Sequence, residues 1–175
     1  MNNLNKNFKL WYAKLKKGNI GEDIVKQHLI KKYPEYDILA HIQSKSHWID
    51  FIIMNKENLD IKFCEVKTKE KWRKFDAIGF DEEDYNNYVL LHNKTGEEIF
   101  IYFVEELKSE IRLLKLSEAI KYDDLGETYR HYANKTVNWY INKHTKFVSH
   151  LSDYDKKLLK EINEEIKNIN NDTYN

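Results

Sequence analysis

Three charged residues lie within or beside two apolar, strand-like segments of the sequence. Asp50 stands between Ile49 and Phe51 in a mostly apolar run, and Glu65 and Lys67 end a second such run. Because successive side chains of a strand point to opposite faces, Glu65 and Lys67 share one face. If the two strands pair as a hairpin, Asp50 joins them there. Two carboxylates with an open coordination sphere suit Mg²⁺, which binds through one or two carboxylates and keeps several waters.

A lysine beside such a metal ion has two useful roles in phosphate chemistry. It can position or deprotonate an attacking water, or it can stabilise the negative charge that develops on the phosphate. The hypothesis therefore takes Asp50 and Glu65 as ligands of Mg²⁺, which Mn²⁺ can replace, with help from the main-chain carbonyl of Val66. Lys67 is the lysine that acts on the reaction.

Each of these residues also has a simpler interpretation. Asp50 could be a solvent-facing residue of a half-exposed strand, although Asp is depleted in strands and here has apolar residues on both sides. Glu65 and Lys67 could form a surface ion pair, which contributes little stability. The combination of all three favours a functional site.

The ordered set resembles the PD-(D/E)XK nuclease superfamily. The segment Gly18-Asn19-Ile20-Gly21-Glu22 is also similar to the first helix of its Holliday-junction-resolvase-like branch, in which the Glu joins the active site. The resemblance covers roughly residues 18 to 104 and implies that Glu22 acts with Asp50, Glu65 and Lys67. One position departs from the family pattern, because Ile49 stands where the name-giving proline would be.

Apolar spacing predicts the elements that would position these residues. We expect a helix from about Ile20 to Lys32, followed by strands over 36–42, 48–54 and 59–66. This order, helix and then three strands, is also that of the nuclease core that the resemblance implies. Further strands are expected over 88–92 and 99–104, with short strand potential around 112–116 in a partly helical segment. Residues 121–150 show no clean period.

The resulting prediction is an α/β (α+β) fold with a restriction-endonuclease-like core. A central mixed β-sheet would be flanked by helices, and a helical extension would follow at the C-terminus. The chain, residues 1–175, is expected to form a single domain with its core over about 18–104 and the extension over about 105–175. An apolar stripe predicts the last helix: Leu158, Leu159, Ile162, Ile166 and Ile169.

A basic segment follows the proposed site and is a candidate nucleic-acid contact. Its residues could follow a phosphate backbone while a Trp stacks on a base, or could form an ordinary solvated turn with the Trp packed on the core. The candidate residues are Lys69, Lys71, Trp72, Arg73 and Lys74. The whole chain has 29 basic and 29 acidic residues, so its zero net charge speaks mildly against non-specific coating of nucleic acid.

The remaining composition bears on location. The single cysteine, Cys64, excludes an intramolecular disulfide and fits a reducing cytoplasm. No apolar run has the length of a membrane span, and no signal peptide is expected at the N-terminus. A cytoplasmic protein without a membrane partner is therefore expected.

The preferred hypothesis is a metal-dependent nuclease, a hydrolase of phosphodiester bonds in nucleic acid, with DNA favoured over RNA. One alternative is a catalytically inactive nucleic-acid-binding module of the same fold. Another is a structural or interaction protein that works through its C-terminal helix. The resemblance to the resolvase-like branch, whose members act as dimers with two active sites, also implies a homodimer.

Overall fold

The computed structural model describes residues 3–40, 49–70, 75–131 and 133–171, which form five helices and nine strands in the described ranges. None of the helices in these ranges is long and apolar enough to cross a membrane. The elements, in chain order, are α1 (Asn3–Lys32), β1 (Tyr36–Ala40), β2 (Phe51–Asn55), β3 (Ile61–Lys69), β4 (Ala77–Asp81), α2 (Glu82–Thr95), β5 (Ile99–Glu105), β6 (Glu110–Lys115), α3 (Leu116–Asp124), β7 (Tyr129–His131), β8 (Thr136–Tyr140), α4 (Ile141–His144), β9 (Lys146–His150) and α5 (Asp153–Asn171).

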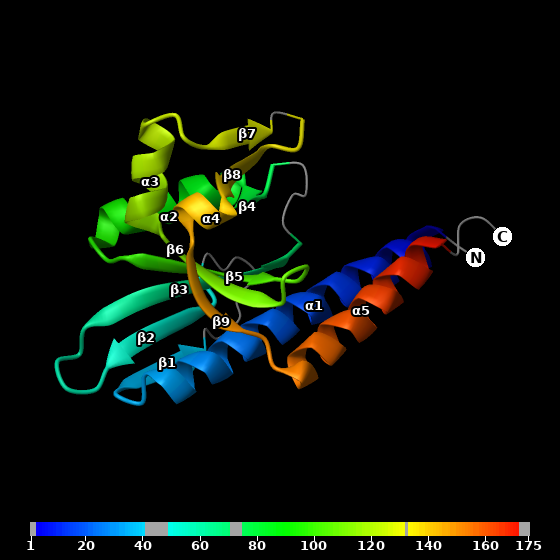
Figure 1. The fold of residues 1–175 in the computed structure, drawn as a ribbon, viewed down its shortest axis with the longest axis horizontal. Helices are drawn as coiled ribbons and strands as arrows, with labels where there is room; N and C mark the ends of the chain where they lie inside the picture. The colour runs from blue at the N-terminus through cyan, green and yellow to red at the C-terminus, as the bar shows by residue number, and fades with distance from the viewer. Residues whose placement is uncertain (1–2, 41–48, 71–74, 132, 172–175) are drawn as a thin grey trace.

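The main sheet has six strands in the order β1-β2-β3-β5-β6-β9. Strands β3 and β5 are parallel, and the other neighbours are antiparallel. A separate antiparallel sheet has the order β4-β8-β7. The predicted architecture is confirmed: a central mixed sheet is flanked by helices, and a C-terminal helix follows it (Figure 1).

The two faces of the main sheet carry separate hydrophobic cores. On β5, Tyr102 and Val104 point to the face that α1 and α5 cover, where Leu29 and Leu159 pack. On the other face a larger cluster joins β5 and β6 to α2, α3 and the small sheet (Figure 1). Its buried aromatic members include Phe80, Tyr88, Phe103 and Trp139. Each strand of the centre is therefore buried on both sides, which holds it rigidly in place.

The first helix is longer than the sequence predicts. It begins at Asn3 and not near Ile20, and it passes through both Gly18 and Gly21. Glycine costs about 1 kcal/mol in a helix interior, but α1 packs along α5, and Ala13 in its first half is completely buried. These tertiary contacts stabilise a segment that propensity alone disfavours.

The strand predicted over 88–92 is wrong, because these residues belong to α2. Carboxylates occupy the first turn of this helix, and Gly96 ends it in the left-handed conformation with φ 74°. Tyr85 and Tyr88 are its buried residues. In addition, β4, β7, β8 and β9 lie in segments for which no strand was predicted.

Gly21 marks the closest approach of α1 to the sheet, which gives a first testable prediction. A Cβ atom added at Gly21 would lie 1.7 Å from Thr68 Oγ1, whereas one at Gly18 would meet nothing within 4 Å. Gly21→Ala should therefore lower the free energy of unfolding by about 1–3 kcal/mol through overpacking. Gly18→Ala should raise it by roughly 0.5–1 kcal/mol. Urea unfolding of both variants tests this, and equal stabilities would contradict the close packing of α1 on β3.

Candidate active site

The site lies where β3 continues beyond the end of β2. The β2–β3 ladder ends at the pair Phe51–Cys64. On its other side, β3 stays paired with β5 as far as Lys69. The residues of β3 after Cys64 are therefore held by β5 while their opposite edge is no longer covered by β2.

Asp50 sits at this edge and connects it to the end of β2. Its main-chain N–H donates to the carbonyl oxygen of Cys64 at 3.1 Å, which adds one more bond after the ladder. Its carboxylate Oδ2 accepts a hydrogen bond from the N–H of Val66 at 2.7 Å. The main-chain donor of Val66, which the β2 ladder does not reach, is thereby satisfied by a side chain. Since the N–H and C=O of one strand residue point to the same side, the carbonyl of Val66 also faces this edge.

Glu65 and Lys67 share a face of β3, as the sequence predicts. Lys67 Nζ lies 2.8 Å from Glu65 Oε1 and 2.8 Å from Asp84 Oδ2, so one ammonium joins two carboxylates. Glu65 is only 6% exposed and is also hydrogen-bonded to the hydroxyl of Tyr88. The ammonium lies 5.6 Å from the centroid of the Tyr88 ring. This network fixes the position of both strand residues.

Glu22 approaches the same edge from α1. Gly21 packs directly on Thr68 of β3 and thus sets the distance of the helix from the strand. Burial raises the pKa of Glu22 to about 7, and repulsion by Asp50 and by Asp23 adds to the rise. Glu22 is therefore close enough to Asp50 for the two carboxylates to repel each other, and its role in the site, which the resemblance implies, stays a prediction.

Burial and neighbouring carboxylates disfavour the charged forms of the acidic groups at this edge. Burial raises the pKa of Glu65 to about 8, and repulsion by Asp50 adds to the rise, while attraction to Lys67 opposes it. For Lys67, burial alone would lower the pKa, but attraction to Glu65 and hydrogen bonds to Asp84 and Glu65 outweigh burial and raise it. These contacts favour the protonated, cationic form of Lys67.

The candidate nucleic-acid contacts are only partly described. Lys69 continues β3 and so shares the face of Lys67, and burial lowers its pKa. The others, Lys71, Trp72, Arg73 and Lys74, lie outside the described residues.

Two residues of the network were not predicted, namely Asp84 and Tyr88. They are four residues apart on α2, so they lie on one face of the helix and both reach β3. The acidic run that begins at Asp81 is typical of the first turn of a helix, and continuing that helix through residues 88–92, where a strand was predicted, would have placed the two residues together. Nothing in the local sequence indicates that this helix packs beside Lys67.

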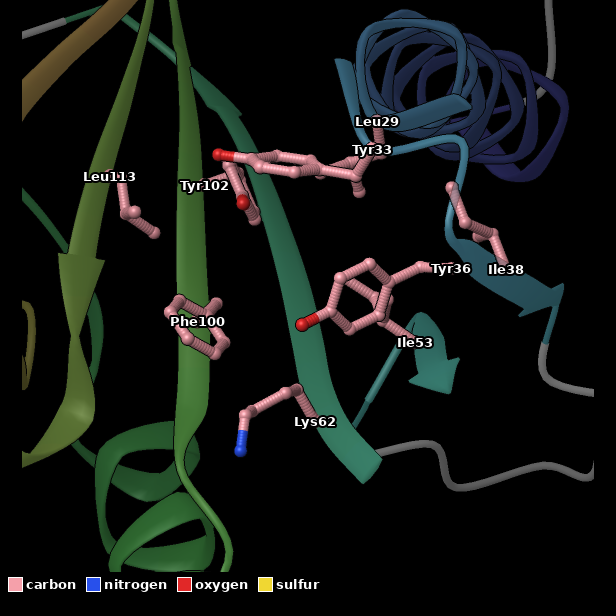
Figure 2. A pocket seen from close by; sticks show the side chains of 9 residues that line it. All are labelled: Leu29, Tyr33, Tyr36, Ile38, Ile53, Lys62, Phe100, Tyr102 and Leu113. Atoms are coloured by element: carbon pink, nitrogen blue, oxygen red, sulfur yellow. The ribbon is translucent and has the colours of Figure 1, made fainter. Parts of the chain in front are cut away.

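A cavity lies elsewhere on the sheet, near the C-terminal end of α1. It has a volume of about 170 Å³, and its lining is mostly apolar and tyrosine side chains, among them Tyr33, Tyr36 and Tyr102, with Lys62 at one side (Figure 2). None of the four predicted catalytic residues lines it, and no carboxylate does within the described part of the chain. The cavity therefore lacks the groups that the proposed chemistry needs.

No protein-family model matches the sequence, and no curated protein matches it. The fold is similar to that of Hjc from Archaeoglobus fulgidus, a Holliday junction resolvase from an archaeal hyperthermophile. The TM-score is 0.45 and the sequence identity is 9%, over 79% of this chain and 93% of that chain.

Proposed function

We propose that this protein is a metal-dependent nuclease of the PD-(D/E)XK type that hydrolyses phosphodiester bonds, with DNA as the favoured substrate. One observation carries the proposal: Asp50, which is bonded to the Val66 N–H, and Glu65, which is paired with Lys67, lie at the same open edge of β3 and repel each other. Two acidic groups next to a fixed cation match the chemistry of phosphate hydrolysis, in which charge must be neutralised on the attacked group.

The residues fit a divalent cation by their charge and by their number. Repulsion by Asp50 contributes to the raised pKa values of both Glu22 and Glu65, so a divalent cation bound at this edge would relieve repulsion between carboxylates. In the described ranges, no group of three or more His, Cys, Asp or Glu residues is arranged to hold a metal ion. Mg²⁺ does not require one, because it keeps several waters and needs only one or two carboxylates. Asp50 and Glu65 would hold it, with the carbonyl of Val66.

Each residue of the site would have its own role in the hydrolysis. Mg²⁺, when bound, supplies Lewis-acid polarisation of the phosphate and lowers the pKa of a coordinated water. The attacking water would give one proton to bulk solvent, and the hydroxide oxygen would bond to phosphorus while the ester oxygen leaves and takes up a proton from solvent. Lys67, held by Glu65 and Asp84, would present a positive charge to the negative charge that develops in this step. Because its contacts favour the protonated form, the role proposed for Lys67 is to orient and stabilise. Asp84 and Tyr88 are positioning residues.

Cleavage by the purified protein tests the proposal. End-labelled linear DNA, a four-way junction and RNA of the same sequence should be incubated with Mg²⁺, with Mn²⁺ and with a chelator. We expect at least one DNA substrate to be cut with either metal and none with the chelator. Binding without cleavage in both metals would instead support an inactive nucleic-acid-binding module, and neither binding nor cleavage would support an interaction protein.

A homodimer and a cytoplasmic location belong to the same proposal. Cutting both strands of a duplex requires two sites, which two-fold symmetry supplies. The apolar stripe of α5 is not needed for this, because Leu159 and Ile162 are already buried within the chain. Cys64 is a buried thiol, in keeping with a reducing compartment.

A further inference from the structure

The first half of α1 and the second half of α5 form an arm that extends past the edge of the main sheet (Figure 1). The two helices run side by side in opposite directions, and the start of α1 lies beside the end of α5 at the tip of the arm. Lys6 donates to the carbonyl oxygen of Asn170, and Lys16 pairs with Glu165. We refer to these helix halves as the arm.

The outer side of the arm carries large side chains that nothing in the described chain covers. Phe8 is 63% exposed, Trp11 58%, Tyr12 55% and Leu15 44%. The rings of Phe8 and Trp11 lie 5.8 Å apart, and the Phe8 and Tyr12 rings are stacked at 6.5 Å. Three neighbouring exposed rings on one helix form a patch of the kind that marks an interaction site.

This patch lies on the same face of α1 as Glu22 of the proposed active site. Phe8, Trp11 and Leu15 are spaced three and four residues apart, and the same spacing continues through Gly18 to Glu22. Residues at this spacing lie along one face of a helix. The stripe therefore leads along α1 from the tip of the arm to Glu22, which interacts with Asp50. From Phe8 to Glu22 the distance is about 21 Å at a rise of 1.5 Å per residue, about six stacked bases at 3.4 Å each.

Within α1, every charged residue before Glu22 is a lysine, although Lys16 and Lys17 are paired with Glu165 and Glu106. Residues 3–21 contain five lysines and no Asp or Glu. Lys9 and Lys14 are exposed and lie on either side of the rings, and Lys17 is held by an ion pair with Glu106. Aromatic faces flanked by lysines are the combination with which proteins hold a nucleic-acid strand, since bases stack on the rings and phosphates meet the cations.

We propose that the arm is a strand-binding surface: Phe8, Trp11 and Tyr12 stack on unpaired bases of a nucleic acid while Lys9 and Lys14 contact its phosphates. The strand then runs along α1 toward Glu22. The path to Glu22 rests on the proposed function, whereas the binding by the rings does not. A second copy of the chain is a poorer occupant of this face, because a two-fold contact would bring the lysines of one copy against those of the other.

The test is binding of a fluorescent twelve-nucleotide single-stranded DNA to the full chain in chelator, where no cleavage occurs. Trp11→Ala should weaken binding by about 10-fold, as loss of one stacking ring does. Lys9→Gln and Lys14→Gln should each reduce the salt slope by roughly 0.7. Tyr154→Ala is the matched control: Tyr154 is 69% exposed but lies near the start of α5, so binding should stay at the wild-type level.

The outcomes separate this inference from the nuclease proposal. Weakened binding by Trp11→Ala supports the arm even if the wild-type protein cuts nothing. Unchanged binding by a Phe8→Ala/Trp11→Ala variant overturns it, even if the wild-type protein cuts DNA. Two results would assign the stripe to another partner and would also overturn the inference. One is a Trp11-dependent fluorescence change with phosphatidylserine vesicles but not with DNA. The other is a loss of dimer mass in sedimentation when Trp11 is replaced.

Discussion

Asp50→Asn and Glu65→Gln are each expected to lower Mg²⁺-dependent cleavage of DNA by about 10³-fold. Loss of one anionic ligand removes several kcal/mol of stabilisation at a metal site, and each 1.36 kcal/mol is a factor of ten in rate. Both replacements keep the size of the side chain. The amide oxygen introduced by Asp50→Asn can still accept the bond from the Val66 N–H, which the native carboxylate accepts at 2.7 Å. The fold should therefore survive while activity is lost.

Single-turnover cleavage rates of the two variants and the wild-type protein measure this effect. Asp37→Asn is a suitable control, since Asp37 lies on β1 and its carboxylate is half exposed, 3.5 Å from the ammonium of Lys56. Circular dichroism should show the same helix content in all four proteins. Wild-type cleavage by both site variants would remove Asp50 and Glu65 from the active site.

Lys67→Ala is expected to reduce the turnover rate by about 10²-fold with little effect on DNA binding. Removing one preorganised group that acts on transition-state charge has an effect of this size. A group that acts only in the transition state lowers kcat without changing substrate affinity. Because Lys67 also neutralises Glu65, which is buried, thermal unfolding must show that the variant is folded at the assay temperature. Lys67→Arg keeps the charge and should retain more activity than Lys67→Ala.

Lys69→Ala provides the contrast, because Lys69 shares the strand face but has no ion pair with Glu65 among the contacts of the described residues. It should weaken DNA binding and reduce the salt dependence by about one phosphate contact, with kcat nearly unchanged. Measured separately, kcat and KM distinguish the two lysines. The reverse pattern, with kcat lost in the Lys69 variant and affinity lost in the Lys67 variant, would exchange their roles.

The central part of the fold was predictable because its signals are local. Strands β2, β3 and β5 have apolar residues over lengths typical of buried strands, and the two-residue period alone places Glu65 beside Lys67. Asp50 was singled out as a candidate by its contrast with apolar neighbours. The register of β2 on β3, which places the Asp50 carboxylate on the Val66 N–H, is a tertiary fact that the period does not determine.

The other parts of the fold and of the site were not predictable, because they depend on contacts between distant parts of the sequence. Asp84 and Tyr88 enter the site because α2 packs against β3, a contact between distant parts of the sequence. β4 and β8 are five-residue strands whose pairing partners lie far along the chain. The early part of α1 was left out of the predicted helix because Gly18 and Gly21 lower helix propensity before the main apolar stretch, and its packing along α5 stabilises it as a helix.

The most direct test of the central claim is to locate the metal ion. Crystals of the wild-type protein and of Asp50→Asn should be soaked in Mn²⁺, and anomalous diffraction should be recorded from both. The account predicts one anomalous peak in the wild-type protein, between the carboxylates of Asp50 and Glu65 and about 2 Å from an oxygen of each, and no peak there in Asp50→Asn. A wild-type protein with no peak between these two carboxylates at millimolar Mn²⁺ would contradict it.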